Sequence, residues 1–197
     1  MKHLFMKKIT KFLMAFVLFG VISCSDDDSS STSSCSSTIP FLQPGKTFTY
    51  NLSQFGFDSG TINLAYGECN GNGFLVTRQS FDPSGAAGAI ATDLYKQEGD
   101  FLLTDSNNNN DYFAKIYKKN ATLGESWDVT RPDGSITTHE VVDIDSLVTV
   151  PAGSFHCKVF KYTTTTAANE SFVFWNDEVG NIMEDAGFFK LELKTHN

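Results

Sequence analysis

Residues 126–136 read Ser-Trp-Asp-Val-Thr-Arg-Pro-Asp-Gly-Ser-Ile, and this stretch decides the fold class. Polar and apolar side chains alternate over residues 126–130, which is the period of a β-strand with one buried face. Residues 132–134, Pro-Asp-Gly, then form a turn signal, because proline fixes φ and glycine reaches the left-handed region without strain. The stretch therefore predicts a β-hairpin that resumes at Ile136, and a hairpin joins antiparallel strands.

The same pattern recurs along the chain from Ile39 onward. Residues 47–52 and 61–66 each alternate cleanly, so each predicts a strand with one buried face. Residues 86–97 are compatible with a short helix, but Gly88 and the turn that follows make a strand in a hairpin at least as favourable. We expect about a dozen short strands, separated by turns at spacings typical of antiparallel all-β folds.

Several of the expected strands are apolar on both faces. Residues 111–118 place Tyr112 on one face and Phe113 and Tyr117 on the other, and residues 172–175 are apolar throughout. A sheet covered on one side only would not need this pattern. We therefore predict a strongly curved antiparallel sheet that forms a barrel or half-barrel, with a two-sheet sandwich as the alternative.

The first residues read as an export signal. Residues 1–11 carry four lysines and no acid, and residues 12–22 form an apolar run of the length expected of a signal peptide. The run is short for a membrane-spanning helix and ends at Cys24 and three aspartates. Residues 21–24, Val-Ile-Ser-Cys, resemble the bacterial lipobox, and this resemblance implies cleavage before Cys24 and acylation of its thiol, with palmitate as one expected acyl group.

These features divide the chain into three parts. Residues 1–23 are the predicted lipoprotein signal peptide, residues 24–38 a lipidated, flexible tether rich in Ser and Asp, and residues 39–197 a single all-β domain. The expected membrane contact is the lipid anchor at Cys24, since two or three acyl chains hold a protein firmly.

The charge pattern bears on location and on partners. The aspartates at residues 26–28 resemble the surface-export signal of Bacteroidota lipoproteins, which implies an outer-membrane location with exposure at the cell surface; a solvated spacer is the alternative. The chain has 15 Lys+Arg against 23 Asp+Glu, a formal net charge of -8, and this acidic balance argues against nucleic acid as a partner.

A second resemblance lies in the C-terminal third. Residues 150–155, Val-Pro-Ala-Gly-Ser-Phe, are followed by a basic and aromatic strand and by Trp175, which precedes a turn through Gly180. This order resembles a family of bacterial cell-surface lipoproteins of unknown function with a V-P-A-G-[ST]-F motif. Residues 44–50 look like the opening element of that family. The matching residues are turn and core residues, so the resemblance implies a curved, barrel-like fold and no catalytic role.

The remaining cysteines permit one disulfide. If residues 47–52 and 61–66 form a hairpin, the chain before it lies near the chain after it, which favours the pair Cys35 and Cys69. The alternative pair is Cys69 with Cys157. An exported compartment permits either bond.

Candidates for catalysis and metal binding are weak. No two histidines stand at zinc-ligand spacing, and residues 105–111 depart from the calcium-loop pattern, which favours a solvated turn. Glu140, Asp143 and Asp145 favour a solvated face over a glycosidase pair, although a distant carboxylate could complete one. We therefore expect no enzyme activity, no cofactor and no metal.

Two classes of function remain. The first is a binding module whose sheet encloses or presents an apolar or glycan ligand. Its expected contact residues are the aromatic side chains Tyr112, Phe113, Tyr117, Trp127 and Trp175. The second is a structural or protein-interaction lipoprotein with a filled core. A cavity of several hundred Å³ would favour the first class, and a packed interior the second.

Overall fold

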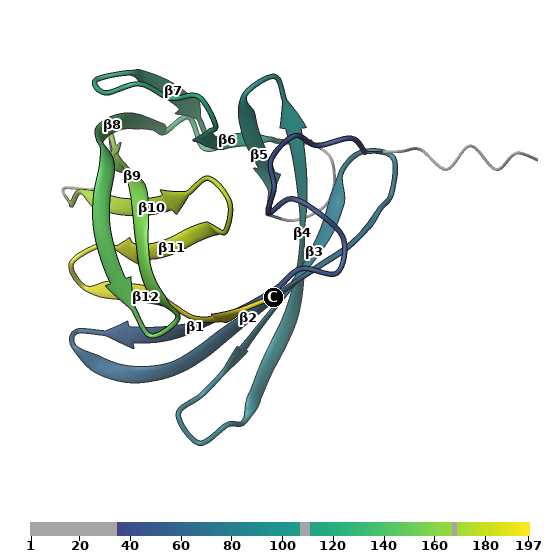
Figure 1. Ribbon diagram of the computed structural model, residues 1–197, viewed down its shortest axis with the longest axis vertical. Coiled ribbons are helices and arrows are strands. Elements are labelled where there is room, and N and C mark those ends of the chain that lie inside the picture. The colour runs from purple at the N-terminus through teal and green to yellow at the C-terminus, as the bar shows by residue number, and fades with distance from the viewer. Residues whose placement is uncertain (1–34, 107–110, 167–168) are drawn as a thin grey trace, which may run out of the picture. The chain divides into compact units, whose positions relative to one another are not determined.

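The computed structural model describes residues 35–106, 111–166 and 169–197. Within these ranges twelve strands form one antiparallel sheet that curls into a nearly closed barrel (Figure 1). The strands are β1 Thr47–Gln54, β2 Phe57–Cys69, β3 Phe74–Phe81, β4 Ala87–Glu98, β5 Phe101–Asp105, β6 Ala114–Lys118, β7 Ser126–Thr130, β8 Ile136–Val150, β9 Gly153–Thr164, β10 Ser171–Asn176, β11 Gly180–Asp185 and β12 Phe189–His196. The predicted all-β class and its barrel form are confirmed.

The strands follow one another around the barrel in sequence order. Except for β6 and β7, strands that follow one another along the chain pair with each other, and β1 also pairs with β12, so the first and last strands lie side by side. The ladder is interrupted at one place among the described residues, between β6 and β7, which are the two edges of the sheet. The barrel is therefore open along a single line.

The hairpin of residues 126–136 forms as its sequence predicts. The N–H of Arg131 donates to the carbonyl of Ser135 at 2.8 Å, and Gly134 has a φ of 81°. The Asp133 carboxylate accepts hydrogen bonds from the backbone N–H and the hydroxyl of Ser135, at 2.9 and 2.7 Å. The region that also suited a short helix is strand β4, which pairs with both β3 and β5.

Side chains alternate between the barrel interior and the outside. On β1, Phe48 and Tyr50 are buried and face inward, while Thr49 and Asn51 lie on the outer face. A close backbone crossing occurs at Gly60 of β2, where an added Cβ would lie 1.9 Å from the carbonyl oxygen of Phe81. Only glycine fits there, because the end of β3 passes directly over this position.

Residues 35–46, here called the N-terminal segment, pack into the interior ahead of β1. Ile39, Phe41 and Leu42 are almost fully buried. The ring centroid of Phe41 lies 5.7 Å from that of Tyr117 on β6 and 5.6 Å from that of Trp175 on β10. The segment therefore adds apolar side chains that the sheet alone does not supply.

A disulfide and two hydrogen bonds fix the beginning of this segment. Cys35 forms a disulfide with Cys69 at the end of β2. The Gln97 side chain on β4 accepts a hydrogen bond from the N–H of Thr38 at 2.7 Å, and the Lys119 ammonium donates to the carbonyl of Thr38, also at 2.7 Å. The last four residues of the predicted tether, 35–38, are thus attached to the barrel.

The predicted signal peptide, the predicted lipidation site Cys24 and the predicted tether up to residue 34 lie outside the described residues. In the part of the chain that the structure describes, no helix has the length and apolar character to cross a membrane.

Side chains hold together the line between β6 and β7, here called the seam. The Trp127 indole N–H on β7 donates to the carbonyl of Lys115 on β6 at 3.1 Å, and the Tyr162 hydroxyl on β9 donates to the carbonyl of Ile116 at 2.6 Å. An ion pair between Lys118 and Glu125 lies at one end. Side chains close the seam, whereas backbone hydrogen bonds close the rest of the barrel.

Candidate ligand-binding site

A cavity of about 470 Å³ lies inside the barrel, and is referred to as the interior cavity. It is bounded by inward-facing side chains of β1 to β6 on one side and of β9 to β12 on the other. Its wall is mainly apolar and aromatic. Its lining includes Tyr50, Leu64, Tyr66, Arg78, Asp93, Tyr95, Tyr162, Trp175, Val179, Asn181 and Glu184.

Five aromatic side chains with polar atoms form much of this wall. They are Tyr50 on β1, Tyr66 on β2, Tyr95 on β4, Tyr162 on β9 and Trp175 on β10. Burial raises the pKa of Tyr95 to about 12 and also raises the pKa values of Tyr50, Tyr66 and Tyr162 well above the usual range of a tyrosine. The tyrosines therefore stay uncharged at physiological pH and offer ring faces to the cavity, while the hydroxyls of Tyr50 and Tyr162 donate to the carbonyls of Asn181 and Ile116.

Glu184 on β11 places a carboxyl group in this aromatic wall. Burial raises its pKa to about 7, and its charge in turn raises the pKa values of Tyr50, Tyr95 and Tyr162. No hydrogen bond or ion pair links the Glu184 side chain to another described residue. A carboxyl group that is half ionised near neutral pH thus lies among aromatic rings without a counter-ion.

The remaining charged groups of the interior cavity already pair with each other. The Arg78 Nε on β3 lies 3.3 Å from an Asp93 Oδ on β4. Loss of solvation raises the pKa of Asp93, and the charge of Arg78 opposes this rise. Among the described lining residues Arg78 is the single cation, so the interior holds two carboxyl groups and one guanidinium.

A second pocket, of about 520 Å³, lies beside the seam and adjoins the interior cavity. The two share Thr104, Ser106, Ile116 and Tyr162 in their walls. His139 on β8 lines this seam pocket, and burial together with the charge of Arg131 lowers its pKa to about 4. The histidine is therefore neutral at physiological pH.

Polar atoms without partners gather around these two spaces. Five buried side-chain atoms of the described residues have no hydrogen-bond partner: Asp93 Oδ1, Trp175 Nε1, Asn181 Oδ1, His139 Nδ1 and Tyr112 Oη. The first three line the interior cavity and the last two line the seam pocket. Buried polar groups are normally paired with protein or with ordered water, so these five atoms mark positions where a further hydrogen-bond partner fits.

The five aromatic residues predicted as ligand contacts take different places. Trp175 lines the interior cavity, and Tyr112 lines the seam pocket. Tyr117 is fully buried, with its hydroxyl donating to Asp177 at 2.6 Å, and Trp127 belongs to the seam. Phe113 lies under the Lys96 ammonium, 3.8 Å from its ring centroid. Two of the five therefore line a cavity wall, while the other three make packing contacts.

The sequence prediction missed Glu184 and most of the tyrosines around it. Tyr50 and Tyr66 occupy inward positions of the two strands whose alternation was recognised, so their placement was readable from the period of two. Glu184 had no such signal, because a carboxylate in an alternating segment is normally assigned to the solvent face.

The other polar candidates form ordinary surface contacts. Glu140 pairs with Lys161 at 2.7 Å, and Asp145 lies 2.7 Å from the exposed His156 ring.

Cys157 is a buried free thiol, and its burial raises its pKa to about 12. Residues 107–110 of the loop between β5 and β6 lie outside the described residues.

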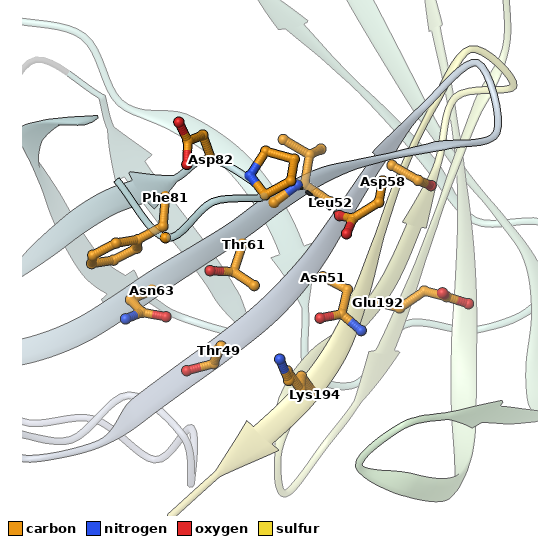
Figure 2. A pocket seen from close by; sticks show the side chains of 14 residues that line it. Thr49, Asn51, Leu52, Asp58, Thr61, Asn63, Phe81, Asp82, Glu192 and Lys194 are labelled. Carbon is orange, nitrogen blue, oxygen red and sulfur yellow. Dashed lines mark hydrogen bonds between the residues drawn. The ribbon is translucent and has the colours of Figure 1, made fainter. Parts of the chain in front are cut away.

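A third hollow, of about 690 Å³, lies on the outer face of β1, β2 and β12 and is called the outer groove. Figure 2 shows Asn51, Asn63 and Thr61 along its floor, with the Phe81 ring at one side and Glu192 and Lys194 at the other. Its wall is polar and open to solvent, in contrast to the interior cavity.

Comparisons with known proteins place the fold without naming a function. No family model and no curated protein matches the sequence. The fold is similar to that of a Bacteroides fragilis protein described as exported and as having a YmcC-like fold, with a TM-score of 0.56 and 11% identity. It is also similar to that of a protein from Parabacteroides distasonis described as a lipoprotein, with a TM-score of 0.52 and 14% identity. Each comparison covers 79% of this chain and 96% of the other, so this chain shares its barrel with these two proteins.

Proposed function

We propose that this protein is a non-enzymatic binding module that holds a small, mainly apolar ligand in the interior cavity. The observation that carries the proposal is the gathering of five unpaired buried polar atoms around the interior cavity and the seam pocket. Cavities of several hundred Å³ with an apolar wall and a few polar groups are typical of ligand sites. A structural lipoprotein with a filled core is the poorer alternative, because the interior is hollow.

A fluorescent apolar probe tests this proposal. The full-length chain carrying Cys24→Ser, which lacks the predicted acylated thiol, is titrated with N-phenyl-1-naphthylamine. We expect saturable fluorescence that Leu64→Trp weakens at least tenfold, because the larger ring occupies the interior cavity. Val179→Phe, a smaller filling change in the same wall, should act in the same direction.

The matched control is Leu147→Trp, which places the same side chain at an exposed position of β8. This variant should bind the probe as the parent does. Unsaturable fluorescence, or equal affinity in both filling variants and the control, would contradict binding in the interior cavity. Circular dichroism of each variant confirms that the sheet is intact.

We further propose that acyl groups at Cys24 anchor the barrel to the outer membrane with the domain exposed at the cell surface. The lipobox-like residues 21–24 and the following aspartates support this placement. Labelling of cells with radioactive palmitate should mark the parent chain and leave Cys24→Ala unmarked. Protease added to intact cells should degrade the barrel, whereas complete protection would contradict surface exposure.

The outer groove supports a second candidate, binding of a glycan. A half-exposed Phe81 ring lies beside amide and hydroxyl groups of Asn51, Thr61 and Asn63, and this combination of ring face and polar atoms suits a sugar (Figure 2). Titration with a panel of soluble oligosaccharides tests it by calorimetry. Heat that Asn63→Ala abolishes and Leu64→Trp leaves unchanged would assign sugar binding to the outer groove.

A further inference from the structure

We propose that the ligand of the interior cavity is an organic cation, an amine with an apolar body, whose ammonium group binds at Glu184. The proposal rests on the proposed function and makes it more specific, since it states which chemical class the cavity selects. It depends on three properties of the wall: an unpartnered carboxyl group, the aromatic rings around it, and an excess of unpaired hydrogen-bond acceptors.

The first property is the charge balance of the interior cavity. Of its two carboxyl groups, Asp93 has Arg78 at 3.3 Å, while Glu184 has no described cation as a partner. A carboxylate held away from water without a counter-ion is strongly unfavourable. An ammonium group on a ligand supplies the missing charge, whereas an anionic ligand would add a second unpaired one.

The second property is the aromatic wall. Tyr50, Tyr95, Tyr162 and Trp175 come from four different strands and line the same cavity as Glu184. An aromatic ring carries negative charge density on its faces, so a desolvated ammonium near several rings is stabilised by cation–π attraction. The apolar remainder of such a ligand would contact Ile62, Leu64 and Leu191 of the same wall.

The third property is the type of the unpaired polar atoms. Within the interior cavity Asp93 Oδ1 and Asn181 Oδ1 are acceptors, and the indole Nε1 of Trp175 is a donor. Together with the oxygens of Glu184, the acceptors outnumber this donor. A primary ammonium offers three N–H donors, which matches this excess.

Ionisation of Glu184 then makes binding depend on pH. The groups around it from the other strands are Tyr50, Tyr95 and Tyr162, all uncharged at physiological pH, and the Arg78–Asp93 pair lines the same cavity. With the pKa of Glu184 near 7, the carboxylate that accepts the ammonium is about ten times more abundant at pH 8 than at pH 6. The affinity for the amine should therefore fall about tenfold when the pH is lowered from 8 to 6.

Three probes with the same apolar body test the proposal: 4-phenylbutylamine, 4-phenylbutanol and 4-phenylbutyrate. Each competes with N-phenyl-1-naphthylamine for the Cys24→Ser chain at pH 8. We expect the amine to bind at least tenfold more tightly than the alcohol, and the carboxylate most weakly. Glu184→Gln, which keeps the shape and removes the charge, should weaken the amine at least tenfold and leave the alcohol unchanged.

Glu98→Gln on β4 is the matched control, because Glu98 is exposed and pairs with Lys96 at 2.6 Å. This variant should bind all three probes as the parent does. Equal affinity for amine and alcohol in the parent, or amine binding that survives Glu184→Gln, overturns the selection for a cation while leaving the binding cavity in place. Displacement by none of the three probes overturns the binding cavity itself. The comparison of the probes on the parent chain needs no variant to fold.

Discussion

Glu184 lowers the stability of the fold at the wall of the interior cavity. Its carboxyl group is withdrawn from most of its contact with water into an aromatic wall, and no described cation pairs with it. Binding sites often reduce the stability of the free protein, since polar groups that pair with a ligand have no partner in its absence.

The stability of the protein should therefore depend on pH through this residue. The pKa of Glu184 is raised to about 7 in the folded state. Between about pH 4.5 and pH 7, Glu184 therefore loses its proton in the unfolded chain and keeps it in the folded chain. Stability is then greatest below this interval and falls as the pH rises through it. At pH 8 we expect Glu184→Gln to be more stable than the parent by on the order of 2 kcal/mol, after allowance for the partial exposure of the group.

Urea denaturation of the parent and of Glu184→Gln at pH 5 and pH 8 measures this effect. The two proteins should have nearly equal stability at pH 5 and differ at pH 8. His139, whose lowered pKa acts in the opposite direction below pH 6.5, is common to both proteins and cancels in the comparison. A difference that is the same at both pH values would show that ionisation is not its cause.

Gly60 carries a second prediction at the scale of one residue. An alanine methyl group there would overlap the Phe81 carbonyl oxygen, and the φ of 103° is unfavourable for any side chain. We expect Gly60→Ala to cost about 2 kcal/mol or more in the free energy of unfolding. Gly56→Ala is the control, because its φ of 80° is similar but no atom lies within 4 Å of the added Cβ, so its cost should be about 1 kcal/mol.

The strands were largely predictable from the sequence, and the N-terminal segment was not. Alternation and Gly-containing turns identify β1, β2 and the β7–β8 hairpin, because these signals act over a few residues. The packing of Phe41 against Tyr117 and Trp175 joins residues that are far apart along the chain, and no local pattern reports it. The interior cavity is a product of the same long-range contacts, so its tyrosines were readable as inward positions but not as one wall.

The disulfide at the start of the N-terminal segment supplies the prediction for this element. It joins residues 34 positions apart, and a closed loop of this length typically contributes about 2–4 kcal/mol by restricting the unfolded chain. We expect the double change Cys35→Ser and Cys69→Ser to lower the free energy of unfolding by that amount in urea denaturation. Addition of a reductant to the parent should have the same effect and should leave the double variant unaffected.

Across the whole molecule, the seam is the weakest line of the barrel. Elsewhere each strand exchanges backbone hydrogen bonds with two neighbours, but the facing edges of β6 and β7 depend on side chains such as Trp127 and Tyr162. The seam pocket lies beside this line and adjoins the interior cavity. Opening of the seam would therefore give a ligand a lateral path into the interior.

Trp127→Phe tests the seam, because it keeps an aromatic ring at this position and removes the indole N–H that bonds to the Lys115 carbonyl. We expect amide hydrogen exchange to accelerate in β6 and β7 by about tenfold, while β1, β2 and β12 keep their rates. The entry rate of N-phenyl-1-naphthylamine should rise in the same variant with little change in its equilibrium affinity. Uniform acceleration over all strands would instead indicate general destabilisation.

The pairing of β1 with β12 decides when the barrel can form during synthesis. Every other ladder joins strands that leave the ribosome one after the other, whereas β1 waits for a partner that is made more than a hundred residues later. Until then the outer edge of β1 is an exposed template for pairing with other chains. The ring therefore cannot close until residues 189–196 have been made, and its closing is a late, single event in the maturation of the chain.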